Sequence, residues 1–140
     1  MAIRNLFLAG EFRVRRLWLV VGWAFVLLVI YLSLTPAPIE VPIGQGDKFS
    51  HILAYVVLMS WFVNLYENPA QRIGFALGFI VLGVALEFLQ RWTGHRSFEV
   101  ADMTANAVGV ALGWVLAPPR LPNYLRFIEK VCKARNGSKK

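Results

Sequence analysis

Four apolar stretches dominate the chain, and each is about as long as a helix that crosses a membrane. They cover residues 17–34, 48–66, 73–91 and 100–117. A membrane-spanning helix needs about 20 mostly apolar residues, with a range of roughly 17–25. The first three stretches are apolar around the whole helix, whereas a surface helix of a soluble protein keeps a polar face. The pattern predicts an all-α integral membrane protein, with four transmembrane helices in a compact bundle that forms a single domain over residues 1–119.

The composition supports a membrane protein and argues against a soluble one. Hydrophobic residues make up 57% of the 140 residues and charged residues 16%, whereas soluble domains have about 45–50% and about 25%. A soluble domain of this size could not cover its surface with so few polar groups. The alternative, buried core helices of a soluble protein, would leave no amphipathic helix to shield them. A single cysteine, Cys132, allows neither an intrachain disulfide nor a cysteine-based metal site.

The net charge of +7 indicates topology here rather than a nucleic-acid partner. Twelve of the 15 Lys and Arg residues lie before the first stretch, between the second and the third, or after the fourth. The other three, Lys48, Arg91 and Arg96, lie at the opposite ends of the stretches. Positive residues stay on the cytoplasmic side of a membrane. The distribution predicts that both termini are cytoplasmic.

Residues 120–140 form a basic cytoplasmic tail in this interpretation. Between residues 123 and 135, apolar side chains alternate with Arg and Lys. This alternation resembles a basic amphipathic helix that lies on an anionic inner leaflet. A merely solvated basic tail explains the same pattern equally well.

Polar side chains gather where three of the stretches should reach the outer face. They are Asp47, Lys48, His51 and Tyr55 at the start of the second stretch, Glu87 and Gln90 at the end of the third, Arg96 in the next loop, and Asp102 and Asn106 at the start of the fourth. Ionisable residues inside a membrane are costly and are usually functional. We therefore interpret these residues as a candidate ligand-binding site, in which Asp102 pairs with a cation such as Arg96 or Lys48. We predict no bound metal and no cofactor.

The fourth stretch also carries a ridge of small residues, which permits close contact between helices. The ridge consists of Ala101, Ala105, Gly109, Gly113 and Ala117, with a weaker counterpart at Gly74 and Gly78 on the third stretch. Asp102 and Asn106 lie beside the ridge, so they should face the bundle. The alternative interpretation is that the polar residues serve only to hold the helices together. Interhelical hydrogen bonds average about 0.6 kcal/mol, and so weak a contribution does not require so many ionisable groups.

The ordered set of polar residues resembles the VanZ-like family of bacterial membrane proteins. The resemblance covers Leu32-Ser33-Leu34-Thr35-Pro36, Asp47-Lys48 with His51 and Tyr55, Glu87 with Gln90, Arg96-Ser97-Phe98-Glu99, and Asp102, Asn106 and Gly109. It implies a multi-pass protein of the bacterial cytoplasmic (inner) membrane, with a link to teicoplanin-type glycopeptide antibiotic resistance. It implies no reaction.

Three kinds of function fit this sequence. The first is a non-enzymatic envelope protein that binds an anionic lipid-linked or glycan ligand, such as an envelope precursor or a glycopeptide. The second is a membrane hydrolase or transferase in which His51 acts as general base, oriented by Asp102 or Glu87. The third is a small lipid or solute transporter. The absence of G-x-S-x-G and H-E-x-x-H motifs favours the first, whereas the sequence leaves open whether the chain is a homo-oligomer.

Overall fold

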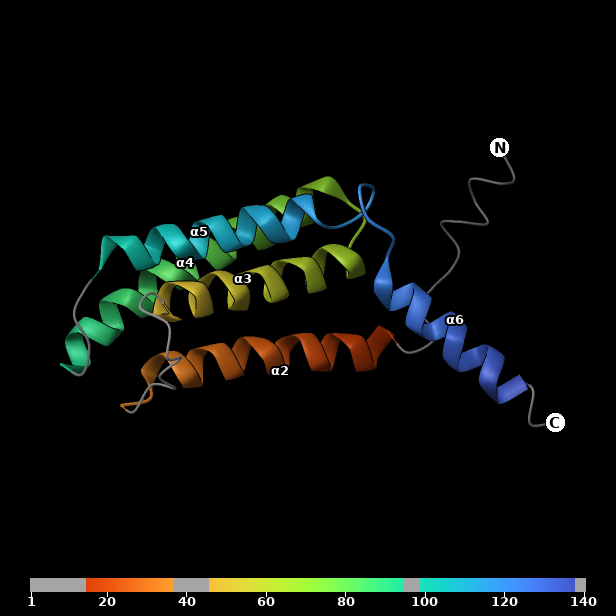
Figure 1. The fold of residues 1–140 in the computed structure, drawn as a ribbon, viewed down its shortest axis with the longest axis horizontal. Coiled ribbons are helices and arrows are strands. Elements are labelled where there is room, and N and C mark those ends of the chain that lie inside the picture. The colour runs from red at the N-terminus through yellow and green to blue at the C-terminus, as the bar shows by residue number, and fades with distance from the viewer. Residues whose placement is uncertain (1–14, 37–45, 95–98, 138–140) are drawn as a thin grey trace.

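The computed structural model describes residues 15–36, 46–94 and 99–137, and every element within these ranges is a helix. The helices are α2 (Arg15–Leu34), α3 (Gly46–Leu65), α4 (Pro69–Thr93), α5 (Val100–Val115) and α6 (Tyr124–Gly137). Helices α2 to α5 run side by side as a bundle, and α6 extends obliquely from one end of it (Figure 1). The predicted all-α class is confirmed.

Three helices are long and apolar enough to cross a membrane, namely α2, α3 and α4. Helix α5 is apolar but shorter, with 16 residues. Large apolar side chains cover the outside of the bundle; among them, Val20, Leu27 and Val81 are each about two-thirds exposed. Such a surface is costly in water and favourable against lipid tails. The described part of the chain therefore has the helices of a membrane protein.

Helix α4 begins earlier than the hydropathy pattern predicts, at Pro69 rather than at residue 73. Asn68 caps the helix, because its side-chain Oδ1 accepts a hydrogen bond of 2.9 Å from the backbone N–H of Ala70. Pro69 follows at the first helical position, where its missing N–H costs nothing. The cap and the proline extend the helix into a polar segment that hydropathy alone leaves outside it.

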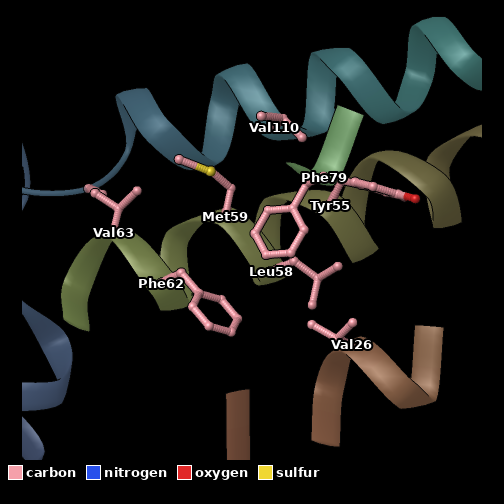
Figure 2. Close-up of a cluster of buried hydrophobic side chains, with 9 residues drawn as sticks. Val26, Tyr55, Leu58, Met59, Phe62, Val63, Phe79 and Val110 are labelled. Carbon is pink, nitrogen blue, oxygen red and sulfur yellow. The ribbon is translucent and has the colours of Figure 1, made fainter. Parts of the chain in front are cut away.

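The core is built around α3. Figure 2 shows buried side chains from α3 meeting one residue each from α2, α4 and α5. These residues are Tyr55, Leu58, Met59, Phe62 and Val63 on α3, with Val26 on α2, Phe79 on α4 and Val110 on α5. Because α3 supplies most of the buried side chains, it positions the other three helices.

Glycines on α5 bring it directly against α3, as the predicted small-residue ridge requires. A Cβ added at Gly109 would lie 2.5 Å from the carbonyl oxygen of Ile52, and one added at Gly113 would lie 2.7 Å from that of Val56. Both distances are far inside van der Waals contact, so only glycine fits. A Cβ at Gly74 or Gly78 would meet nothing within 4 Å, and the weaker ridge on α4 therefore makes no such contact.

The end of the bundle next to α6, here called the α6 end, is held together by hydrogen bonds to backbone carbonyls. Arg72 donates from Nε to the carbonyl oxygen of Tyr66 (2.7 Å), from Nη1 to that of Pro118 (2.8 Å) and from Nη2 to that of Val63 (3.0 Å). The carbonyls of Val63 and Tyr66 lie at the carboxyl end of α3, where a helix leaves its last carbonyls unpaired. One guanidinium thus caps α3 and joins it to the segment after α5.

Candidate functional site: a polar cluster at one end of the bundle

The opposite end of the bundle, here called the polar end, is where α3 begins, α4 ends and α5 begins (Figure 1). The first turns of α3 and α5 place their polar side chains opposite each other there. Asp102 and Asn106 lie four residues apart on α5, and Lys48 and His51 lie three apart on α3. Each spacing keeps both side chains on one face of the helix. Local helix geometry therefore brings two polar pairs together across the tightest helix contact in the bundle.

Lys48 makes two ionic contacts of different kinds at this end. Its Nζ lies 2.8 Å from Oε2 of Glu99 and 3.6 Å from Oδ1 of Asp102. The Asp102 side chain is 8% exposed, whereas those of Lys48 and Glu99 are 33% and 45% exposed. The ammonium thus stands at the boundary of the bundle, with a buried carboxylate behind it and a solvent-facing carboxylate beside it.

His51 continues the row into the bundle. Its Nδ1 lies 2.9 Å from Oδ1 of Asn106, and its Nε2 lies 4.0 Å from Oδ2 of Asp102. An amide oxygen only accepts hydrogen bonds, so the assigned orientation of Asn106 makes Nδ1 the donor. The two oxygens of Asp102 therefore face different partners, Lys48 on one side and His51 on the other.

Glu87 is fully buried at the end of α4. Its Oε1 accepts a hydrogen bond of 2.8 Å from the backbone N–H of Glu99, the residue that immediately precedes α5. This bond fixes where α5 begins, and with it the backbone from which the Glu99 side chain reaches Lys48.

Gln90 and Tyr55 lie apart from the row of Lys48, Asp102, His51 and Asn106. Gln90 donates from Nε2 to the carbonyl oxygen of Ser33, at a distance of 2.7 Å, so it links α4 to the end of α2. Tyr55 belongs to the hydrophobic core (Figure 2), and within the described residues its hydroxyl has no hydrogen-bond partner. Both were predicted as site residues, and both make their described contacts outside this row.

Two predicted site residues lie outside what the structure describes. Asp47 is in the first turn of α3, but its side chain is outside the described part, and Arg96 lies in the undescribed segment before α5. The expected pairing of Asp102 with Arg96 therefore stays a prediction. Among the described residues, Lys48 is the cation that Asp102 meets.

The sequence pattern does not indicate two residues of the site, Glu99 and Gly83. Glu99 belongs to the family resemblance and lies three residues before Asp102, a spacing that favours a shared partner. Gly83 gave no signal of its own. A Cβ at Gly83 would lie 2.9 Å from Nδ2 of Asn106 and 3.2 Å from the Tyr55 hydroxyl oxygen, so glycine lets α4 close over Asn106.

The polar side chains of the row mostly face one another. Both ring nitrogens of His51 face side chains of α5, whereas a general base needs a nitrogen directed at the substrate. Within residues 15–36, 46–94 and 99–137, no group of three or more His, Cys, Asp or Glu side chains is placed to hold a metal ion. Lys48 is the charged donor of the row that reaches solvent.

Comparison with known proteins gives one distant relative. The uncharacterized protein C11E3.10 of Schizosaccharomyces pombe is 25% identical over 130 residues, which cover 91% of this chain and 76% of that protein. No family model matches the chain, and no solved structure matches it. The relative is fungal, so this similarity does not point to a bacterial membrane in particular.

Proposed function

We propose that this chain is a four-span membrane protein, VanZ-like in its polar residues, whose polar end binds an anionic headgroup at the outer face of the membrane. The ligand class is a phosphate or carboxylate carried by a lipid-linked or glycan molecule. The observation that carries the proposal is the position of Lys48, a part-exposed ammonium between a buried and an exposed carboxylate. The bacterial envelope and the link to glycopeptide resistance belong to the proposal through the family resemblance alone.

The topology part of the proposal rests on helix directions and charge. Helices α3 and α5 begin at the polar end and α4 ends there, so a fourth span by α5 would place both chain ends on the opposite side. Twelve of the 15 basic residues fall on that opposite side. The positive-inside rule then makes the α6 end cytoplasmic and the polar end external.

An exchange of partners at Lys48 is the proposed binding step. Glu99 holds the Lys48 ammonium, and the side chains of both residues are partly exposed to solvent. Exposed ion pairs contribute only about 0–1 kcal/mol. An incoming phosphate carries more charge and more acceptor oxygens than one carboxylate. It displaces the Glu99 side chain, while the backbone of Glu99 remains bonded to Glu87.

Asp102 keeps Lys48 in place during this exchange. Its carboxylate is buried between Lys48 and His51 and is not displaced by a ligand that approaches from the membrane surface. A buried carboxylate is stable only beside partners that compensate its charge. Asp102 therefore holds the ammonium at the boundary of the bundle whether or not Glu99 is bound to it.

A binding experiment with a matched pair of probes tests this function. The full chain in lipid nanodiscs is titrated with farnesyl phosphate and, as the uncharged control, with farnesol, and the complexes are counted by native mass spectrometry. We expect the phosphate to bind and farnesol not to compete with it. Lys48→Gln should abolish the preference for phosphate, whereas Arg120→Gln, which removes an exposed basic residue at the other end and outside α6, should not. Equal binding of both probes, or an unchanged preference in Lys48→Gln, would refute the proposal.

A further inference from the structure

Helix α6 has a fixed attachment to the bundle and a free apolar face. Asn123 joins the two, because its Nδ2 donates to the carbonyl oxygen of Asn64 (2.8 Å) and its Oδ1 accepts from the backbone N–H of Arg126 (3.1 Å). Leu125 is fully buried against the bundle, and Glu129 accepts a hydrogen bond of 2.7 Å from Nε1 of Trp18. These contacts set the direction in which α6 leaves the bundle (Figure 1).

The remaining faces of α6 differ in chemistry, since one is apolar and another is basic. Phe127, Ile128 and Val131 are 65%, 41% and 51% exposed, and their spacing places them along one stripe of the helix. Lys130 and Lys133 are exposed on another side. An apolar stripe beside basic residues and outside the bundle is typical of a helix that an apolar and anionic surface covers.

The residues around the attachment of α6 indicate which surface covers its apolar stripe. Trp18, Trp61, Tyr66 and Tyr124 gather around the attachment, and the guanidinium of Arg15 lies over the Tyr66 ring, 5.4 Å from its centroid. Tryptophan, tyrosine and arginine are typical of the headgroup level of a membrane-spanning protein. Helix α6 therefore starts at the headgroup level and extends obliquely from there (Figure 1).

We propose that α6 lies on a leaflet that contains anionic phospholipid, with the stripe of Phe127, Ile128 and Val131 in the acyl region and Lys130 and Lys133 at the phosphates. This inference is independent of the ligand site at the polar end. The contacts of Asn123, Leu125 and Glu129 hold the helix against the end of the bundle, and the stripe lies on a different side of the helix.

Spin labels on the full chain in nanodiscs test this arrangement. In a Cys132→Ser background, Val131→Cys and Lys133→Cys place a nitroxide on the apolar and on the basic side of the same turn. In phosphatidylcholine nanodiscs that contain phosphatidylglycerol, we expect the label at 131 to favour collisions with oxygen and the label at 133 to favour collisions with a water-soluble nickel complex. Equal access of the nickel complex to both labels would show a solvated helix and overturn the proposal.

Lipid charge and helix charge supply the matched controls. A basic residue near an anionic surface changes the binding equilibrium by about fivefold, so Lys130→Glu should move the label at 131 toward water when phosphatidylglycerol is present. Arg120→Glu, the same reversal at an exposed residue outside α6, should move it much less. Protection at 131 that is equal with and without phosphatidylglycerol, or that is accompanied by spin–spin broadening from a second copy, would refute the anionic leaflet as the covering surface.

Discussion

Arg72 at the α6 end and Lys48 at the polar end have different kinds of partner, although each end also has contacts of the other kind. At the α6 end, Arg72 and Asn123 donate to backbone carbonyls of other segments. At the polar end, Lys48 and His51 instead meet the side chains of Glu99, Asp102 and Asn106. A backbone carbonyl cannot move away without moving its helix, whereas an exposed side chain can rotate to another partner. The comparison is consistent with a stabilising role for Arg72, and it supports our proposal that Lys48 exchanges partners with a ligand.

The largest effect concerns the topology, because the proposed roles of the two ends require that they lie on opposite sides of the membrane. In a Cys132→Ser background, Thr93→Cys reports on the polar end and Arg135→Cys on the α6 end. We expect an impermeant thiol reagent to label only the first on intact cells, because α3 and α4 run between the two ends. Both positions should react after lysis. Labelling of position 135 before lysis would remove the basis for an external site.

The next largest effect should come from Arg72. Replacing it by methionine keeps an unbranched apolar stem but leaves the carbonyls of Val63, Tyr66 and Pro118 without their donor. Hydrogen bonds to charged groups contribute about 1.5–3 kcal/mol each, and part-exposed ones less. We expect Arg72→Met to lower the free energy of unfolding by about 2–3 kcal/mol, measured by thermal or denaturant unfolding in micelles.

Arg120→Met is the control for that loss, since Arg120 is exposed near the same end. It should change stability by less than about 0.5 kcal/mol. Equal losses in the two variants would mean that the contacts of Arg72 contribute no more to stability than those of an ordinary surface residue.

A smaller effect should come from Gly83 at the polar end. Gly83→Ala pushes a methyl group against Asn106, which pairs with His51. Overpacking of this kind costs about 1–3 kcal/mol, and we expect the lower half of that range because the Asn106 amide can shift. Gly78→Ala, on the same helix with nothing within 4 Å, should be neutral or slightly stabilising. Unfolding midpoints of the two variants measure the difference.

Much of the fold followed from hydropathy, and part of the site followed from helical spacing. Long apolar stretches predict helices wherever they occur, so α2 to α5 were expected near their observed limits. The position of Asp102 and Asn106 beside the small-residue ridge predicted that both face the bundle, and both are buried in it. Helix α4 begins before its apolar stretch, since capping by Asn68 is a local hydrogen bond that hydropathy does not measure.

Contacts between helices were harder to predict than positions along them. Gln90 shares a face with Glu87 in sequence, yet it binds the carbonyl of Ser33 on α2, because α4 lies between two neighbours. The pairing of Lys48 with Glu99 depends on where the chain enters α5, which Glu87 fixes through a backbone N–H. No spacing rule specifies an interaction of that kind.

The central claim is that Glu99 and the ligand compete for Lys48, and a double-mutant cycle tests it most directly. Farnesyl phosphate affinity is measured in nanodiscs for the wild type, Lys48→Gln, Glu99→Gln and the double variant. Loss of an exposed ion pair worth about 0.2–1 kcal/mol should let Glu99→Gln bind about 1.4- to fivefold more tightly than the wild type. The same change should have no effect when Lys48 is already absent, because the two residues act on one interaction. Weaker binding by Glu99→Gln, or an equal gain with and without Lys48, would contradict the account.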